Sequence, residues 1–330
     1  MTLQRPNLFR FATSELSQDA MLCWLLSWAE AGHRTVDEPL HRAGAEFLDA
    51  ILRRAGIEPP ASFRSVCIDR QFEKLDVLAL VNDDIAVLIE DKTHTKQHSG
   101  QLARYREAVR AKYPQRALAA VYYKTGDQGC YKAVEETGFD RISRQDMLGV
   151  LRRGREHGVG SDIFRDYLGH LERLEGAVQA FRSARPEEWT AHAWAGFFIE
   201  LQDIMKGGDW KRVNNEAGGF MGFWWHGTAD KYLLLREAEV CFKVNVAEPD
   251  KGRRRAAWIE WHAALTAEAR HRGRALTREK RALGKDMTVA CMPGDYRRWD
   301  GAGRLDLERT VERLREAESL HDAALARLPA

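Results

Sequence analysis

The sequence predicts a mixed α/β fold of the α+β kind, divided into two domains, and three observations lead to this prediction. The chain has 330 residues, which exceeds one ordinary domain of about 150 residues. In its first half, stretches with helical periodicity alternate with short runs rich in Val, Ile and Leu. Eight of the ten tryptophans follow residue 185, so the composition changes there. We therefore expect a boundary at Ala184–Pro186 and domains spanning residues 1–183 and 184–330.

Two helices are expected at the start of the first domain. Ser14 offers N-cap chemistry ahead of the apolar run from Ala20 to Ala29, which indicates a largely buried helix. A second helix is expected over residues 37–55, because its apolar residues recur at three-and-four spacing. Pro39 in the first turn and Gly56 after the last are favoured at those positions.

Strands follow these two helices. Three apolar runs separated by polar, turn-like residues predict an antiparallel meander, at residues 65–72, 75–81 and 85–90. A helix and a fourth strand are expected next, at residues 101–112 and 117–123. One more strand and two helices complete the domain, at residues 139–143, 146–153 and 161–182. The order helix, three strands, helix, strand argues against a doubly wound parallel sheet.

The second domain is expected to be α+β as well. Strands are predicted at residues 219–225, 232–235 and 239–246, ahead of helices at residues 256–270 and 305–325. The tryptophan pairs Trp224-Trp225 and Trp258…Trp261 have two interpretations. Core packing is favoured, and stacking on nucleobases is the alternative.

Composition excludes several classes of protein. With 44% hydrophobic and 30% charged residues and 9 prolines, the chain is expected to fold and to be soluble. No apolar stretch reaches the roughly 18 residues needed to span a bilayer, and the N-terminus does not resemble a secretory signal. Five widely spaced cysteines predict small buried residues in a reducing compartment rather than disulfides or a zinc site. We expect a cytoplasmic protein without membrane contact.

Two consecutive apolar strands carry the residues most indicative of chemistry. If Asn82–Asp84 forms a three-residue loop, Val81 pairs with Ile85 and Asp76 lies opposite Glu90. Carboxylates facing each other at about 5 Å repel, so a cation is expected between them, and oxygen ligands favour Mg²⁺. Lys92 lies on the same strand face as Glu90 and can assist an attacking water. The alternative is a solvated edge with an exposed ion pair, but both strands are continuously apolar, which indicates that both sheet faces are covered.

This pattern, Asp76 followed by Glu90-Asp91-Lys92, resembles the PD-(D/E)xK nuclease superfamily over roughly residues 14–150. The core of that superfamily, the restriction-endonuclease-like core, has the same order of helix, three-strand antiparallel meander, helix and strand. Leu75 stands where the motif has proline. The resemblance implies that Asp76, Glu90 and Lys92 are catalytic, and that Asp76, Glu90 and the carbonyl of Asp91 bind the metal.

Two neighbouring segments extend the resemblance. Gln101 and Tyr105 look like the QxxxY element of one branch, in which they orient the lysine or a substrate phosphate; a polar helix edge is the alternative. The segment from Glu15 to Leu26 resembles uncharacterised bacterial members of that branch. Glu15 is either an additional carboxylate on the metal or a favourable charge at a helix N-terminus.

A basic segment marks the second domain. Residues 251–285 contain eleven Lys or Arg and three Glu, a local charge of +8 in a chain of net charge +2. We expect Arg253, Arg254 and Arg255 to contact nucleic-acid phosphates. A solvated helix face is the alternative for these residues.

Together these features predict a Mg²⁺-dependent nuclease, with Mn²⁺ as a substitute, that hydrolyses phosphodiester bonds and prefers DNA to RNA. The resemblance implies a role in restriction or phage defence. The alternative is a catalytically silent nucleic-acid-binding or regulatory protein that kept the nuclease fold. In that case residues 184–330 would bind a partner, a protein or a second copy of this chain; a structural subunit of a larger assembly also stays open.

Overall fold

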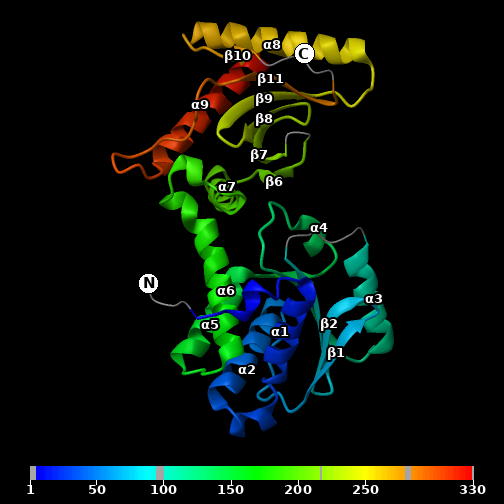
Figure 1. Ribbon diagram of the computed structural model, residues 1–330. Helices are drawn as coiled ribbons and strands as arrows, with labels where there is room; N and C mark the ends of the chain where they lie inside the picture. The colour runs from blue at the N-terminus through cyan, green and yellow to red at the C-terminus, as the bar shows by residue number, and fades with distance from the viewer. Residues whose placement is uncertain (1–4, 94–99, 216–217, 279–283, 329–330) are drawn as a thin grey trace. The chain divides into compact units, whose positions relative to one another are not determined.

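The computed structural model describes residues 5–93, 100–215, 218–278 and 284–328. They form two compact units, Met1–Gly176 and Ala177–Ala330 (Figure 1). The expected boundary at residues 183 and 184 falls inside the second unit, because Phe181 packs in the core of that unit. The Pro186 signal marks a local feature instead, a single 3-10 turn over Pro186–Glu188.

The first unit contains the helices and strands expected from its sequence. Ser14 caps the first helix and Asp37 the second, each by accepting a backbone N–H. The elements are η1 (Leu8–Arg10), α1 (Glu15–Ser27), η2 (Ala31–Thr35), α2 (Glu38–Arg54), β1 (Val66–Phe72), β2 (Leu75–Val81), β3 (Ile85–Lys92), α3 (Gln101–Lys112), β4 (Ala117–Lys124), α4 (Lys132–Glu135), β5 (Asp140–Ser143), α5 (Arg144–Glu156) and α6 (Asp162–Gln179).

The five strands of this unit form one sheet in the order β1-β2-β3-β4-β5. The first three strands are an antiparallel meander, and Val81 pairs with Ile85 as expected from the three-residue loop. After α3, β4 runs parallel to β3, and β5 runs parallel to β4. The mixed α/β arrangement predicted for this part of the chain is confirmed.

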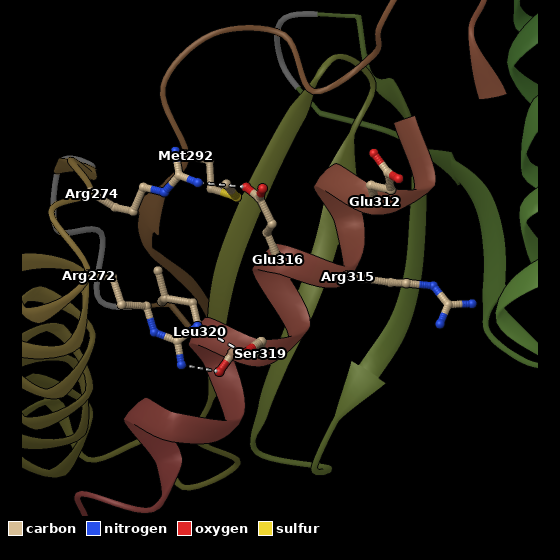
Figure 2. A pocket seen from close by; sticks show the side chains of 8 residues that line it. All are labelled: Arg272, Arg274, Met292, Glu312, Arg315, Glu316, Ser319 and Leu320. Atoms are coloured by element: carbon tan, nitrogen blue, oxygen red, sulfur yellow. Dashed lines mark hydrogen bonds and ion pairs between the residues drawn. The ribbon is translucent and has the colours of Figure 1, made fainter. Parts of the chain in front are cut away.

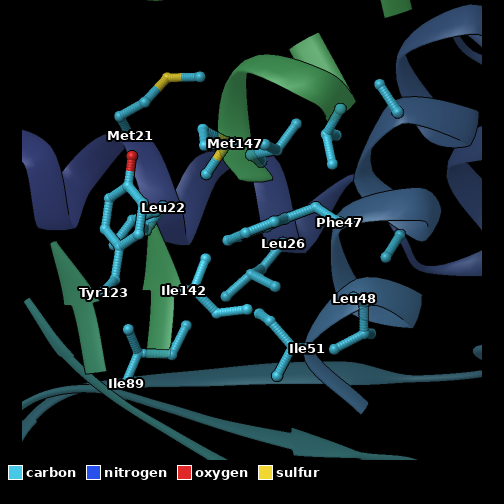
Figure 3. Close-up of a cluster of buried hydrophobic side chains, with 14 of the residues drawn as sticks. Met21, Leu22, Leu26, Phe47, Leu48, Ile51, Ile89, Tyr123, Ile142 and Met147 are labelled. Carbon is cyan, nitrogen blue, oxygen red and sulfur yellow. The ribbon is translucent and has the colours of Figure 1, made fainter. Parts of the chain in front are cut away.

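Helices cover both faces of the sheet, which explains the continuous apolar strands. Apolar residues of α1, α2, α5 and α6 form the larger core with one sheet face (Figure 3). Residues of α3 and the short α4 form a smaller core on the other face. Figure 1 shows β1 and β2 between α1 and α2 on one side and α3 on the other. Any charged side chain between these layers therefore lies in a largely dry environment.

The second unit has an α+β fold, as expected. Its six-stranded sheet has the order β10-β11-β9-β8-β7-β6, and all its strand pairs are antiparallel. The elements are η3 (Ala180–Arg182), η4 (Pro186–Glu188), α7 (Ala191–Met205), β6 (Asp209–Val213), β7 (Phe220–Gly227), β8 (Lys231–Arg236), β9 (Glu239–Asn245), α8 (Lys251–His271), β10 (Thr277–Arg278), β11 (Asp286–Cys291) and α9 (Leu307–Leu325). Residues of α7, α8 and α9 form the core on one sheet face.

The tryptophans of this unit have different environments. Trp258 and Trp261 are fully buried in the core, so the core interpretation holds for this pair. Trp225 packs against the same core, whereas Trp224 lies on the opposite face beside Leu234 and Cys241. Both side chains of this pair are half-buried and pack against apolar clusters, on opposite faces because neighbouring side chains alternate along a strand.

Two other expectations concern cysteines and membranes. Cys23, Cys241 and Cys291 are buried, but Cys67 and Cys130 are exposed, so burial does not explain all five. Within the described ranges, none of the helices is long and apolar enough to cross a membrane.

Candidate active site

The end of the β2–β3 hairpin brings the predicted carboxylates together. The pairs from Val81↔Ile85 to Val77↔Ile89 fix the register, and its continuation sets Asp76 across from Glu90. The Asp91 backbone N–H donates to Asp76 Oδ2 at 2.8 Å, which anchors the carboxylate to β3. Because side chains alternate along β3, Glu90 and Lys92 face α3 whereas Asp91 faces α1.

The ammonium of Lys92 is surrounded by oxygens. Nζ lies 2.7 Å from Glu90 Oε1, 3.5 Å from Asp76 Oδ2 and 3.7 Å from Glu15 Oε2. It also donates to the backbone carbonyl of Asp91 at 2.7 Å. These negative groups raise the pKa of Lys92 although burial lowers it. The four oxygens therefore form a site for a cation.

Glu90 is a fully buried member of the site. Its side chain is 0% exposed; Oε1 accepts from Lys92 and from Gln101, whereas Oε2 has no hydrogen-bond partner among the described residues. Burial, together with the negative charge of Asp76, raises the pKa of Glu90 to about 8. A buried carboxyl oxygen without a partner is free to bind a ligand.

Gln101 and Tyr105 lie one helical turn apart at the start of α3, the helix that Glu90 faces. Gln101 Nε2 donates to Glu90 Oε1 at 2.9 Å and to the hydroxyl of Tyr105 at 2.8 Å. The tyrosine is nearly buried in the smaller core. These contacts fix the orientation of the Glu90 carboxyl, so the pair acts on Glu90 in this structure.

Glu15, the first residue of α1, lies at the edge of the site. Its Oε1 accepts from the backbone N–H of Thr93 at 3.1 Å, and its other oxygen faces Lys92. The carboxylate therefore connects the N-terminus of α1 to the end of β3. Both expected roles fit this position, since it begins a helix and also contributes an oxygen around the cation.

A second buried lysine was not predicted from the sequence. Lys124 ends β4 directly beside Lys92 in the parallel pairing, and its Nζ lies 3.5 Å from the carbonyl of Thr93. Burial lowers the pKa of Lys124 to about 8. The sequence signal was a lysine closing the apolar run 117–123, at the same end of the sheet as Lys92.

Two buried carboxyls lie on the opposite face of β3. Asp91 accepts a hydrogen bond from Gln18, and Asp19 is 1% exposed with no hydrogen-bond partner among the described residues. Burial raises the pKa of Asp19 to about 6 and that of Asp91 well above its usual range. Asp19 shares a helix face with Leu22 and Leu26, which was the available signal that it points inward.

The predicted phosphate-binding arginines belong to α8 of the second unit. Arg253 and Arg255 are exposed, and Arg254 is half-buried. Arg253 lies 3.6 Å from Glu248. Residues 279–283 of the basic segment lie outside the described residues.

Other arginines of the basic segment have partners within the second unit. Figure 2 shows Arg272 and Arg274 facing α9 across a pocket, while Arg315 points away. Arg272 donates to Ser319 Oγ at 2.9 Å, and Arg274 lies 3.4 Å from Glu316. Part of the local positive charge is therefore used to connect α8 and α9.

The residues present fit a divalent metal ion. The carboxylates of Asp76 and Glu90, the carbonyl of Asp91 and the edge carboxylate of Glu15 are all oxygen donors, which is the preference of Mg²⁺. In this structure the ammonium of Lys92 lies among the same oxygens, at the position where a metal ion would bind. The unpartnered Glu90 Oε2 leaves one further donor.

Comparison with known proteins agrees with this geometry. Residues 6–163 match the family model described as PD-(D/E)XK nuclease superfamily. No curated protein and no solved structure matches the chain. Members of this superfamily are generally nucleases that use divalent metals and act on nucleic acid. The matched segment, just under half of the chain, includes α1, the five strands and every residue of the carboxylate site, so residues 6–163 are similar to the PD-(D/E)XK nuclease superfamily.

Proposed function

We propose that this protein is a Mg²⁺-dependent nuclease that hydrolyses phosphodiester bonds of DNA. The observation that carries the proposal is the convergence of Asp76, Glu90 and the Asp91 carbonyl on one cationic position at adjacent strand ends. These oxygens come from a rigid hairpin between two packed layers, so their geometry is set before any ligand binds.

Each residue has a distinct task in this proposal. Asp76 and Glu90 hold Mg²⁺ with the Asp91 carbonyl, and Mn²⁺ with similar oxygen preference can replace it. The chemistry that the ion supplies when bound is polarisation of a phosphate oxygen and activation of water. Lys92, released from the carboxylates, orients the attacking water and stabilises charge on the phosphate. Gln101 keeps Glu90 in position.

The second unit supplies substrate binding in this proposal. Arg253, Arg254 and Arg255 on α8 contact backbone phosphates, while Arg272 and Arg274 hold the unit together. DNA is proposed over RNA, and a role in restriction or phage defence in the cytoplasm is proposed from the resemblance to the bacterial branch. If the second unit does not bind nucleic acid, it binds a protein partner or a second copy of this chain instead.

A panel of substrates tests the proposal. Purified protein is incubated with supercoiled, linear and single-stranded DNA and with RNA, in Mg²⁺, in Mn²⁺ and in chelator. Metal-dependent cleavage of DNA that exceeds cleavage of RNA supports the proposal. Binding without cleavage in every metal would favour the silent nucleic-acid-binding alternative, and preferential cleavage of RNA would reassign the substrate.

A further inference from the structure

Two histidines and an aspartate converge in the second unit, where β7 meets α9. His226 Nε2 lies 2.7 Å from Asp322 Oδ1, and His321 Nδ1 lies 3.1 Å from the same oxygen. One ligand atom from each residue falls within 4.8 Å of the other two. The cluster contains two imidazoles, so it is chemically different from the carboxylate site of the first unit.

Both ring nitrogens of His321 face oxygen atoms. The ring is 0% exposed, Nδ1 lies 3.1 Å from Asp322 Oδ1, and Nε2 lies 3.2 Å from the backbone carbonyl of Lys231. Both oxygens can only accept hydrogen bonds, and a neutral imidazole has one N–H, so it donates to one of them at a time. With Nε2–H on the carbonyl, the Nδ1 lone pair is available to a metal ion beside Asp322.

The surroundings provide the acceptors that metal-bound histidines use. The Lys231 carbonyl accepts from His321, and Glu318 Oε1 lies 3.9 Å from Nδ1 of His226. Glu318 is in turn held by the Trp225 indole N–H at 2.7 Å. An acceptor on the second ring nitrogen fixes the tautomer and the orientation of a metal-binding histidine. His321 has such an acceptor within hydrogen-bond distance, and the Glu318 carboxylate lies close to the second nitrogen of His226.

The fold brings these residues together through two local features. Glu318, His321 and Asp322 lie at i, i+3 and i+4 of α9 and so share one face. The pairing of β7 with β8 shifts register between Trp224 and Gly227, and such irregularities redirect neighbouring side chains such as His226. Gly227 has φ 111°, and a Cβ there would lie 2.3 Å from the Lys231 carbonyl and 3.0 Å from His321 Nε2. Only glycine allows this approach.

We propose that His226, His321 and Asp322 bind a Zn²⁺ ion, with a fourth position open to solvent. Nitrogen and oxygen donors in this ratio suit zinc, whereas Mg²⁺ prefers oxygen donors alone. Zinc bonds of about 2.0–2.1 Å in tetrahedral geometry separate ligand atoms by about 3.3 Å. The two short contacts in the cluster, at 2.7 Å and 3.1 Å, therefore lengthen by about 0.6 Å and about 0.2 Å. Asp322 is 59% exposed, which gives the ion access to solvent.

The ion would connect β7 to α9 and stabilise the second unit. Zinc bound only by the folded state raises the free energy of unfolding in proportion to the logarithm of its concentration. The readouts are therefore metal content and thermal stability, and neither depends on nuclease activity.

The test uses the full-length chain without a polyhistidine tag. The background carries Asp76→Asn and Glu90→Gln, which removes the carboxylate site; a parallel arm uses the otherwise unchanged chain in excess Mg²⁺. After chelation and dialysis, zinc is titrated calorimetrically, Co²⁺ is followed by its visible absorption, and melting temperature is recorded. His226→Gln and Asp322→Asn alter partly exposed side chains, and His271→Gln at the exposed end of α8 is the matched control.

The proposal expects one zinc per chain in both arms and in the control. Either ligand variant should weaken binding at least about 100-fold and lose both the cobalt absorption and the rise in melting temperature. Circular dichroism checks that these variants are folded. The proposal is overturned if the background binds no zinc, or if the folded His226→Gln and Asp322→Asn proteins bind it as tightly as the control.

Discussion

Neutralising Glu90 should change how the metal-free protein responds to pH. The pKa of this buried carboxyl is raised from 4.5 to about 8 in the folded state. The folded protein therefore binds more protons than the unfolded chain between these values, so its stability falls as pH rises through this window. Each pKa unit corresponds to about 1.4 kcal/mol, which gives an upper limit on the order of 5 kcal/mol for the whole window.

Glu90→Gln removes this dependence because the amide does not ionise. We expect the free energy of unfolding of the variant, relative to the unchanged protein, to rise by several kcal/mol from pH 5 to pH 9 in chelator. Saturating Mg²⁺ should recover much of the lost stability of the unchanged protein at pH 9 and none in the variant, since metal binding favours the ionised carboxylate.

Urea unfolding at a series of pH values measures the effect. Because the chain has two units, hydrogen exchange of peptides that contain β3 assigns the transition to the first unit. Glu107→Gln, on the exposed face of α3, is the matched control and should follow the unchanged protein. Parallel pH curves for Glu90→Gln and the unchanged protein would mean that the pKa of Glu90 is not raised in the folded state, because the Lys92 ammonium compensates fully for burial.

Three further predictions address the remaining groups. Lys92→Met should abolish cleavage but leave Mg²⁺ binding measurable by calorimetry, and cleavage at the unchanged rate would remove the lysine from the mechanism. Gln101→Ala should lower the cleavage rate and weaken Mg²⁺ binding more than Tyr105→Phe does. Of these two residues, only the glutamine hydrogen-bonds to Glu90. Equal Mg²⁺ affinity of the two variants would contradict this prediction. Replacing residues 253–255 by glutamate should lower the affinity for a labelled duplex, measured by fluorescence anisotropy. It should also reduce the slope of log affinity against log salt concentration by about 0.9 per lost phosphate contact. An unchanged slope would show that this segment does not bind the DNA backbone.

The β2–β3 hairpin is the part of the site that could be predicted from the sequence alone. A three-residue loop between two apolar runs fixes the register, and strand alternation then puts Asp76, Glu90 and Lys92 on one face. Both inferences need only local geometry. The partners of these residues did not follow in the same way, because Glu15 arrives from the start of α1 and its approach depends on how that helix packs.

Two features of the first unit escaped prediction for a related reason. Asp19 lies in the second turn of α1, on its buried face opposite Asp91, although a carboxylate near a helix start is also favoured when it is exposed. The apolar run predicts a strand that ends at residue 123, whereas β4 continues through Lys124, because strand propensity does not define where an apolar run ends. In both cases the burial of a charged group is decided by tertiary packing, which outweighs local preference.

Fewer elements of the second unit could be predicted from the sequence. β6 contains Asp209, Lys211 and Arg212 and lies at the edge of the sheet, so it lacks the apolar pattern of an inner strand. α7 is rich in aromatic residues and contains Gly196, which lowers its helix propensity. His226 and His321 come together only after the sheet and α9 have packed, and no sequence spacing indicates their proximity.

Plasmid cleavage by a matched pair of variants shows whether the Asp76 carboxylate belongs to a metal-dependent active site. Asp76→Asn neutralises a carboxylate at the proposed metal position, and Asp83→Asn neutralises the 95%-exposed carboxylate in the loop of the same hairpin. Initial rates on supercoiled DNA are measured across a Mg²⁺ series, with circular dichroism to confirm that both proteins are folded. We expect Mg²⁺-dependent cleavage by the unchanged protein and by Asp83→Asn, and none by Asp76→Asn. Equal rates for the two variants would exclude Asp76 from the active site.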